Sequence, residues 1–397
     1  MSGVEGRRQL GLAVVGVGGA VATTAIAGVE MLKRGGNRAD GLPLADVSVP
    51  GLPDYRDIVF GGWDLNDADL HVAAREHRVL QDGMLTDLRA PLEAIRPWPA
   101  VGSSAFCRNV IGRNMHVAPS HRAAISAIGD DLRRFRDKSN LDGLVMVNLA
   151  STERWPDDGE LFASLDAFER ALDADDERIG PAMLYAYAAI AAGVPYANFT
   201  PSLAADVPAL IEFSRRRNVP IAGKDGKTGQ TMMKTVIAPA LRARALHVDG
   251  WFSTNILGNR DGLALDDPAS LSSKLKTKGR VLDSMLGYPV EDHIVDIRYY
   301  RPRGDDKEAW DNIDVTGFLG QRMQIKVNFL CKDSVLAAPL VLEIGRVLDL
   351  AQQRGDGGVQ EQLSVFFKAP MVANGHAPEH ALHVQQRDLL EWLGTAQ

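Results

Sequence analysis

The stretch from Ile221 to Val236, IAGKDGKTGQTMMKTV, places a loop dense in glycine, threonine and lysine between an apolar run and a helix-like segment. The apolar run, Val219 to Ala222, is typical of a buried strand. A second loop of small polar residues occupies 255–262, and it is followed by a cluster of lysines, Lys274, Lys276 and Lys278. Backbone N–H groups in such loops can surround an anion, and ammonium groups neutralise it. The stretch therefore predicts a binding site for a phosphorylated small molecule.

Length and composition limit the class of protein. The chain has 397 residues, of which 45% are hydrophobic and 24% charged, as in a soluble globular protein with two domains or one large domain carrying an insertion. Its formal net charge of -7 argues against nucleic acid or an anionic membrane as a partner. The two cysteines, Cys107 and Cys331, form no motif, which favours a reducing, cytoplasmic location. We assign no residue to a metal site.

The N-terminal region has two interpretations. Arg7 and Arg8 precede the apolar segment LGLAVVGVGGAVATTAIAGV, a pattern also found in signal peptides of the twin-arginine type. The alternative is a buried strand at 9–15, a turn at 16–19 and a helix from Ala20 to Lys33. The clustering of the glycines favours the strand, turn and helix. Glycines and threonines interrupt the apolar run, which argues against a transmembrane span.

Three glycines and one aspartate favour a dinucleotide-binding domain. Gly16, Gly18 and Gly19 form part of the glycine fingerprint, although Val21 stands where the usual third glycine would be. A second strand starts at Arg56 and ends near Asp64, where such folds bind a ribose through an acidic residue. The alternative role for Asp64 is to cap a helix that begins near Asp67.

The phosphate-loop region resembles the myo-inositol-1-phosphate synthase family, in particular its eukaryotic-type branch. That family carries GDD-x-KSGQTK-x-K, NHLGNND and SKEISK, and the matching segments here are 223–231, 255–261 and 273–278. Further family motifs match in the same order: GWDINN at 62–67, TANTER at 149–154, NGSPQ at 198–202, KY-x-P-x-GDSK at 299–307, CEDSLLATPL at 331–340 and LSYLxKAP at 363–370. The resemblance covers about 10 to 395.

The resemblance implies an α/β fold with a Rossmann-like NAD-binding domain at 1–231 and 336–397. An α+β catalytic and tetramerisation domain at 232–335 is inserted into it. Residues 322–329, RMQIKVNF, alternate between apolar and polar, which predicts an amphipathic strand in an antiparallel sheet with one exposed face. Such a sheet suits continuation across the subunits of a homotetramer.

The implied activity is the NAD-dependent, redox-neutral cyclisation of D-glucose 6-phosphate to 1D-myo-inositol 3-phosphate. It proceeds by oxidation at C5, enolisation, intramolecular aldol closure and reduction, and it is the first step of inositol and inositol phospholipid biosynthesis. The enolate and the C1 alkoxide carry negative charge, which ammonium groups held in place stabilise.

The family's functional residues transfer to matching positions of this chain. The implied catalytic residues are Lys274, Lys278, Lys307, Lys368, Asp261 and Asp333. The implied cofactor-binding residues are Gly16, Gly18, Gly19, Asp64, Ser151, Thr152, Asn198, Asp225 and Asp305. The substrate phosphate is assigned to Thr228, Gly229, Gln230, Asn259 and Lys278. Among these, Lys274 is assigned to the proton shuttle at the C5 oxygen, and Lys307 and Lys368 to the enolate and the C1 oxygen.

For three of the assigned lysines, the surrounding sequence alone also indicates whether a functional role is favoured. Lys274 and Lys278 are four apart and would share a helix face, although most such pairs are simply solvated. Lys368 lies in the apolar segment 363–370, where desolvating an ammonium group is costly, so a functional role is favoured.

Several positions depart from the family motifs. Ala20, Val21 and Ala22 replace the side-chain amides of the glycine motif, and Lys224, Ile256 and Arg260 replace Asp, His and Asn. Extra positive charge beside a phosphate suggests an alternative, a paralogue acting on another sugar phosphate or on a nucleotide-linked sugar. A third interpretation is a non-enzymatic NAD-binding regulator, which the retention of all four lysines disfavours.

Overall fold

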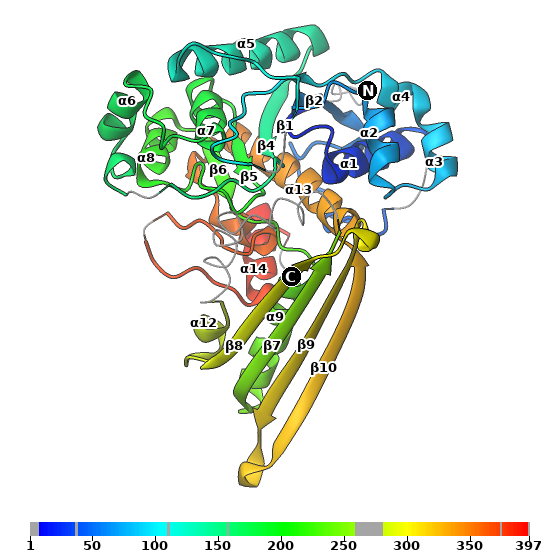
Figure 1. The fold of residues 1–397 in the computed structure, drawn as a ribbon, viewed down its shortest axis with the longest axis vertical. Coiled ribbons are helices and arrows are strands. Elements are labelled where there is room, and N and C mark those ends of the chain that lie inside the picture. The colour runs from blue at the N-terminus through cyan, green and yellow to red at the C-terminus, as the bar shows by residue number, and fades with distance from the viewer. Residues whose placement is uncertain are drawn as a thin grey trace, which may run out of the picture.

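The computed structural model describes residues 8–35, 39–108, 112–156, 159–258, 281–373 and 375–395. Figure 1 shows an upper lobe, in which helices lie on both faces of a parallel sheet, and a second sheet that extends below it. This is the mixed α/β architecture with a second, inserted sheet that the sequence predicts.

The upper sheet has seven strands in the order β11-β6-β5-β4-β1-β2-β3. They are β1 (Leu10–Val15), β2 (Ile58–Asp64), β3 (Trp98–Pro99), β4 (Gly143–Asn148), β5 (Tyr196–Asn198), β6 (Pro220–Gly223) and β11 (Gly358–Val359). Every residue of β1 and β4 is buried, which explains their continuous apolar sequences. The predicted strand, turn and helix at the N-terminus are confirmed by β1 and by α1 (Ala20–Lys33).

The register places the ends of the strands side by side. Val15 pairs with Trp63 on one neighbouring strand and with Asn148 on the other. Asn148 pairs in turn with Asn198, and Asn198 with Gly223. The loops that follow β1, β2, β4, β5 and β6 therefore meet at one edge of the sheet, which is where open α/β sheets bind their ligands.

Helices cover the two faces with separate cores. One core contains residues of α5 (His121–Ser139), α6 (Leu165–Asp173), α7 (Pro181–Ala191) and α8 (Pro208–Arg217). The other contains residues of α1, α2 (Leu70–His77), α3 (Asp82–Asp87), α4 (Arg89–Glu93), α13 (Asp333–Arg354) and α14 (Leu382–Leu393). Helix α13 thus brings the chain back from the second sheet to the first.

The lower sheet has the order β10-β9-β7-β8. Its strands are β7 (His247–Leu257), β8 (Asp292–Tyr299), β9 (Asp306–Thr316) and β10 (Arg322–Lys332), and α9 (Gly229–Ala243) and α12 (Val281–Leu286) pack on one face around Trp251 and Ile313. β10 pairs antiparallel with β9, as the alternating sequence predicts. The antiparallel sheet predicted around this strand is mixed at its other side, because β8 lies parallel to β7.

Within the described ranges, no helix combines the length and apolarity needed to cross a membrane.

Candidate active site

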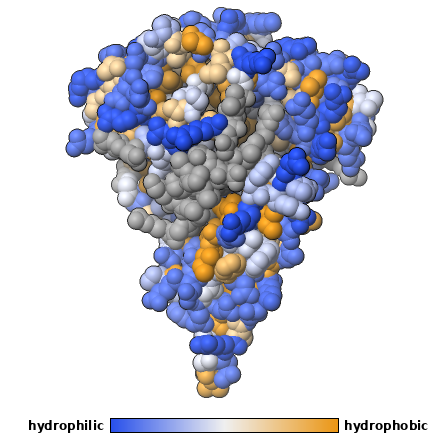
Figure 2. Space-filling model, viewed as in Figure 1, coloured by the Kyte–Doolittle hydropathy of each residue, from blue (hydrophilic) through white to orange (hydrophobic). Residues whose placement is uncertain are grey.

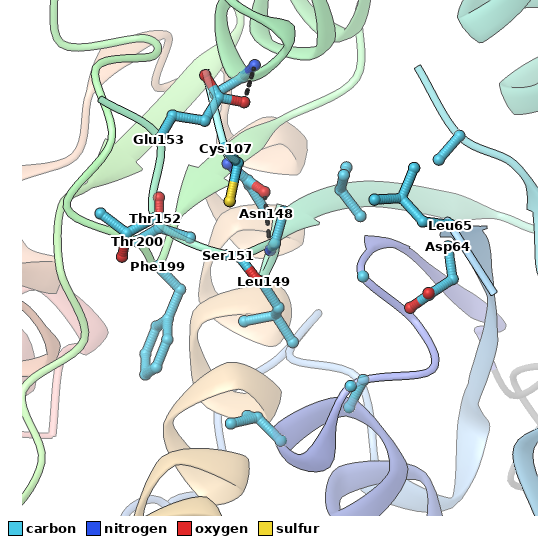
Figure 3. Close-up of a pocket in the computed structure, with 18 of the residues that line it drawn as sticks. Asp64, Leu65, Cys107, Asn148, Leu149, Ser151, Thr152, Glu153, Phe199 and Thr200 are labelled. Carbon is cyan, nitrogen blue, oxygen red and sulfur yellow. Dashed lines mark hydrogen bonds between the residues drawn. The ribbon is translucent and has the colours of Figure 1, made fainter. Parts of the chain in front are cut away.

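A cavity of about 960 Å³ lies at the edge where the strand ends meet. Its walls come from the turn after β1, the loops after β2, β4, β5 and β6, residues within 100–107 and 112–115, and the start of α13. Figure 3 shows part of this wall, with Asp64 and Leu65 on one side and Thr152, Phe199 and Thr200 on the other. The cavity is large enough for a dinucleotide-sized ligand, because small-molecule sites commonly occupy 300–1,000 Å³.

The glycine turn and Asp64 form one end of the cavity. The backbone N–H of Gly18 donates to Oδ2 of Asp64 at 3.0 Å, and Asn66 N donates to Oδ1 at 3.0 Å. A Cβ at Gly18 would lie 3.0 Å from the same carboxylate oxygen, so glycine permits this close approach. Asp64 does not cap the next helix, because α2 is capped by Asp69, whose Oδ1 accepts from Val72 N. The capping alternative for Asp64 is therefore wrong.

The N-terminus of α1 faces the same cavity. Gly16 has a φ of +86°, a conformation that glycine adopts without strain, and Gly19 forms the helix cap without a side-chain hydrogen bond. Ala20, Val21 and Ala22, whose side chains offer no hydrogen bond, line the cavity here. Backbone N–H groups at a helix start suit a pyrophosphate. The helix start can therefore bind such a group without the amide side chains of the family motif.

Two asparagines organise the loops after β4 and β5. Oδ1 of Asn198 accepts hydrogen bonds from Thr200 N at 3.1 Å and from Asn148 Nδ2 at 3.3 Å, and its Nδ2 donates to Ser202 O at 2.7 Å. Asn198 is buried and is not part of the cavity wall, whereas Ser151 and Thr152 are. The structure thus places Asn198 behind the loops, where its side chain fixes their shape.

Two lysine–carboxylate pairs form the other end of the cavity. Nζ of Lys368 lies 2.7 Å from Oδ1 of Asp225, and Nζ of Lys307 lies 3.4 Å from Oδ1 of Asp333. Asp333 also accepts from Oγ1 of Thr228 at 2.9 Å. All five residues line the cavity. Oδ2 of Asp225 is buried and has no hydrogen-bond partner within the part of the chain that the structure describes.

The backbone holds the first pair in place. The loop 223–227 runs beside the segment 366–371: Lys368 N donates to Asp225 O at 2.6 Å, Lys227 N to Phe366 O at 2.8 Å and Met371 N to Gly223 O at 2.7 Å. Asp225 N donates to Thr200 O at 3.1 Å. Lys368, predicted to be functional, is thereby fixed against the loop between β6 and α9.

Besides Gly18 and Asn198, three further predicted site residues lie outside the cavity wall. The Gln230 side chain is buried against the lower sheet, where it donates to Asp311 Oδ2 at 3.2 Å and accepts from Asn255. Gly229 starts α9 beside Cys331. Asp305 accepts from Ser334 N and from Ser334 Oγ, at 3.1 Å and 2.6 Å, and so holds the first turn of α13.

Four further predicted residues, Asn259, Asp261, Lys274 and Lys278, lie outside the described residues.

Two buried ionisable residues were missed by the sequence analysis. Glu153 lines the cavity and accepts from Ala182 N at 3.1 Å, as Figure 3 shows, and burial raises its pKa to about 8. Lys227 contacts Oε1 of Gln385 on α14, and burial lowers its pKa to about 7. Both follow strands in matched motifs, but the sequence does not show that their side chains are buried. Around the cavity and elsewhere in the described ranges, no group of three metal-ligating side chains occurs.

Comparisons with known proteins identify the family of the chain. A family model described as myo-inositol-1-phosphate synthase, of an NAD-binding type, matches residues 40–394. Inositol-3-phosphate synthase 1 of Bacteroides thetaiotaomicron is 43% identical over 96% of this chain and 93% of its own length. Inositol-3-phosphate synthase of Spirodela polyrhiza is 34% identical over 84% of this chain and 70% of its own length.

A solved structure shares the whole architecture. The crystal structure of inositol-3-phosphate synthase from Caenorhabditis elegans superposes with a TM-score of 0.92, at 25% identity, over 99% of this chain and 86% of that one. A related protein from Thermotoga maritima has the same fold, with a TM-score of 0.80 at 24% identity. The family model over residues 40–394 and the 43% identity over nearly the whole chain show that the chain belongs to the myo-inositol-1-phosphate synthase family.

Proposed function

We propose that this protein is an inositol-3-phosphate synthase, which converts D-glucose 6-phosphate to 1D-myo-inositol 3-phosphate with NAD and without net oxidation. The observation that supports it most directly is the meeting of two lysine–carboxylate pairs with a dinucleotide-type turn in one cavity. Cyclisation of a sugar needs both a hydride acceptor and fixed positive charge near the developing oxyanions, and the cavity offers a place for each.

The residues present fit NAD. Asp64 can accept hydrogen bonds from ribose hydroxyls, and the start of α1 can bind the pyrophosphate through backbone N–H groups. Ser151 and Thr152 line the same cavity as Asp225, whose buried Oδ2 still has capacity to accept a hydrogen bond. When bound, NAD accepts a hydride from the sugar and returns it later.

The lysines supply the charge stabilisation. We assign Lys307 and Lys368 to the oxygens that become negative during enolisation and ring closure. Asp333 and Asp225 hold these ammonium groups in position and keep their orientation fixed before substrate enters. We assign the proton shuttle at the C5 oxygen to Lys274, and orientation of the sugar hydroxyls to Asp261.

Only some of the residues that the motif assigns to the substrate phosphate keep that role here. Thr228 lines the cavity and remains the main candidate, together with Asn259 and Lys278. Gln230 is expected to support the loop from behind, since its amide is occupied by Asp311 and Asn255. Gly229 is expected to permit the turn into α9, because its φ is +27°.

We further propose the division into a nucleotide-binding domain, 1–231 and 336–397, and an inserted domain, 232–335. The insert would carry the contacts of a homotetramer. Ile294, Trp310 and Leu330 point to the face of the lower sheet away from α9 and are 49%, 37% and 59% exposed. Figure 2 shows apolar surface on this lower part of the molecule. Exposed apolar side chains of this kind are typical of protein interfaces. The two free cysteines support a cytoplasmic location.

The alternative of a different phosphosugar rests on Lys224 and Arg260. The side chain of Lys224 pairs with Asp206 and is not part of the cavity wall. Lys224 therefore does not support a different substrate. We therefore favour glucose 6-phosphate.

The test is to incubate the purified protein with glucose 6-phosphate and NAD and to look for inositol phosphate by NMR. Formation of inositol phosphate without accumulation of NADH is expected. A protein that binds NAD but forms no inositol phosphate from this substrate would contradict the proposal.

A further inference from the structure

Lys224 precedes Asp225 in the chain, but its side chain turns away from the cavity. Its Nζ lies 2.6 Å from Oδ2 of Asp206 and 4.3 Å from the ring centre of Trp155. The side chains of Lys224 and Asp206 are only 9% and 13% exposed. Because both side chains are largely removed from solvent, substituting one of them leaves the charge of the other uncompensated. The contact is therefore costly to break.

These three residues come from three different loops. Trp155 follows β4, Asp206 follows β5 and Lys224 follows β6. We call them the Lys224 cluster. Two hydrogen bonds anchor it further: Trp155 Nε1 donates to Pro201 O at 2.9 Å, and Oδ1 of Asp206 accepts from Ala204 N at 2.9 Å. The cluster therefore ties together the loops at the ends of three adjacent strands.

The backbone of Lys224 continues into the catalytic pair. Lys224 N donates to Ala369 O at 3.0 Å, and Ala369 N donates to Lys224 O at 3.2 Å. Ala369 follows Lys368, and Lys224 precedes Asp225, so each member of the pair is one residue from this double hydrogen bond. A displacement of Lys224 would therefore shift Asp225 and Lys368 together.

We propose that the Lys224 cluster is a positioning device that fixes the Asp225–Lys368 pair relative to the loops after β4 and β5. The proposal rests on the proposed function. None of the three residues lines the cavity, so they act through Asp225 and Lys368 and not by contact with substrate. Loss of the cluster should lower kcat, because small displacements of reacting groups cost up to about 10²-fold. The KM for glucose 6-phosphate and the affinity for NAD should change little.

The test uses Lys224→Met, Asp206→Asn and the charge-exchanged double variant Lys224→Asp/Asp206→Lys. Each single change is expected to lower kcat by about 10-fold or more, with KM and NAD affinity within a few-fold of wild type. The double variant should recover part of that loss, whereas Lys224→Asp alone, which places two carboxylates together, should be the most impaired. The matched control is Lys33→Met, because Lys33 makes a 2.8 Å ion pair with Glu30 away from the cavity.

A second measurement does not depend on turnover. Hydrogen exchange at the backbone amides of Lys368 and Ala369, read in the absence of substrate, should become several-fold faster in both single variants and slower again in the double variant. Because the exchange measurement needs no turnover, it tests the positioning role independently of the proposed function. An inactive wild type would refute only the proposed function. Unchanged exchange at these amides, or a change in KM at constant kcat, would overturn the proposal. If Lys224→Met does not fold, Asp206→Asn carries the same test.

Discussion

Lys368 is bound to Asp225 twice, through its ammonium group at 2.7 Å and through its backbone N–H at 2.6 Å, although the two residues are 143 positions apart. The side chains are 9% and 4% exposed. An ammonium group held in this way needs little reorganisation when negative charge develops beside it. The pair is therefore the feature of the cavity most suited to catalysis.

Substitution of Lys368 by Ala should lower turnover by roughly 10²-fold or more, the usual cost of losing a charge-stabilising or acid–base group. NAD affinity, measured by calorimetry, should remain within a few-fold of wild type, because Asp64 and the glycine turn are at the other end of the cavity. The same loss is expected for Lys307→Ala, and near-normal turnover in either variant would contradict its assigned role.

Asp64 should select NAD over NADP, because its carboxylate repels a 2′-phosphate. Asp64→Ala should weaken NAD binding by 10-fold or more without unfolding the protein, since the α2 cap belongs to Asp69. Equal affinity of the wild type for NAD and NADP in calorimetry would argue against this role.

Glu153 should make stability fall as the pH rises. Its pKa is raised from 4.5 in the unfolded chain to about 8 in the folded one, so the folded state binds more protons in this window. Stability is therefore lost between about pH 4.5 and 8. Glu153→Gln keeps an acceptor for Ala182 N but cannot ionise. Its melting temperature should match wild type near pH 5 and exceed it by about 2 °C or more at pH 8. A constant difference at both pH values would exclude this cause.

Lys227 should have the opposite pH dependence. Burial lowers its pKa from 10.5 to about 7, so the unfolded chain binds more protons between these values and stability rises with pH across this window. Lys227→Met removes the cost of burying the amine. Its advantage in free energy of unfolding, measured with urea, should be largest near pH 7 and should shrink toward pH 10. Gln385→Leu is the matched control, because it removes the amide partner without removing the amine.

The sequence predicted elements whose pattern is local. Continuous apolar runs marked the buried strands, and the alternation at 322–329 marked β10. The glycine turn and Asp64 were found for the same reason, since a strand, its turn and the following helix are contiguous. The parallel pairing of β8 with β7 was missed because the relative direction of two strands depends on the chain that connects them and not on either strand alone.

The direction of side chains could not be predicted in the same way. Lys224, Asp225, Lys227 and Thr228 stand within five positions of one another, yet two face the cavity and two do not. Their directions depend on partners contributed by remote segments, such as Asp206 and Gln385. Gln230 shows the same limit, because its partner Asp311 lies on β9.

The return of α13 to the upper sheet has a consequence for biosynthesis. During translation the strands β1, β4, β5 and β6 emerge well before α13, which supplies Val341, Ile344 and Val347 to the core on one sheet face. Until then the part of that face that α13 covers stays exposed in the nascent chain, and contacts between such distant segments form slowly. The cavity, which needs Lys368, can therefore be completed only after nearly all of the chain has been synthesised.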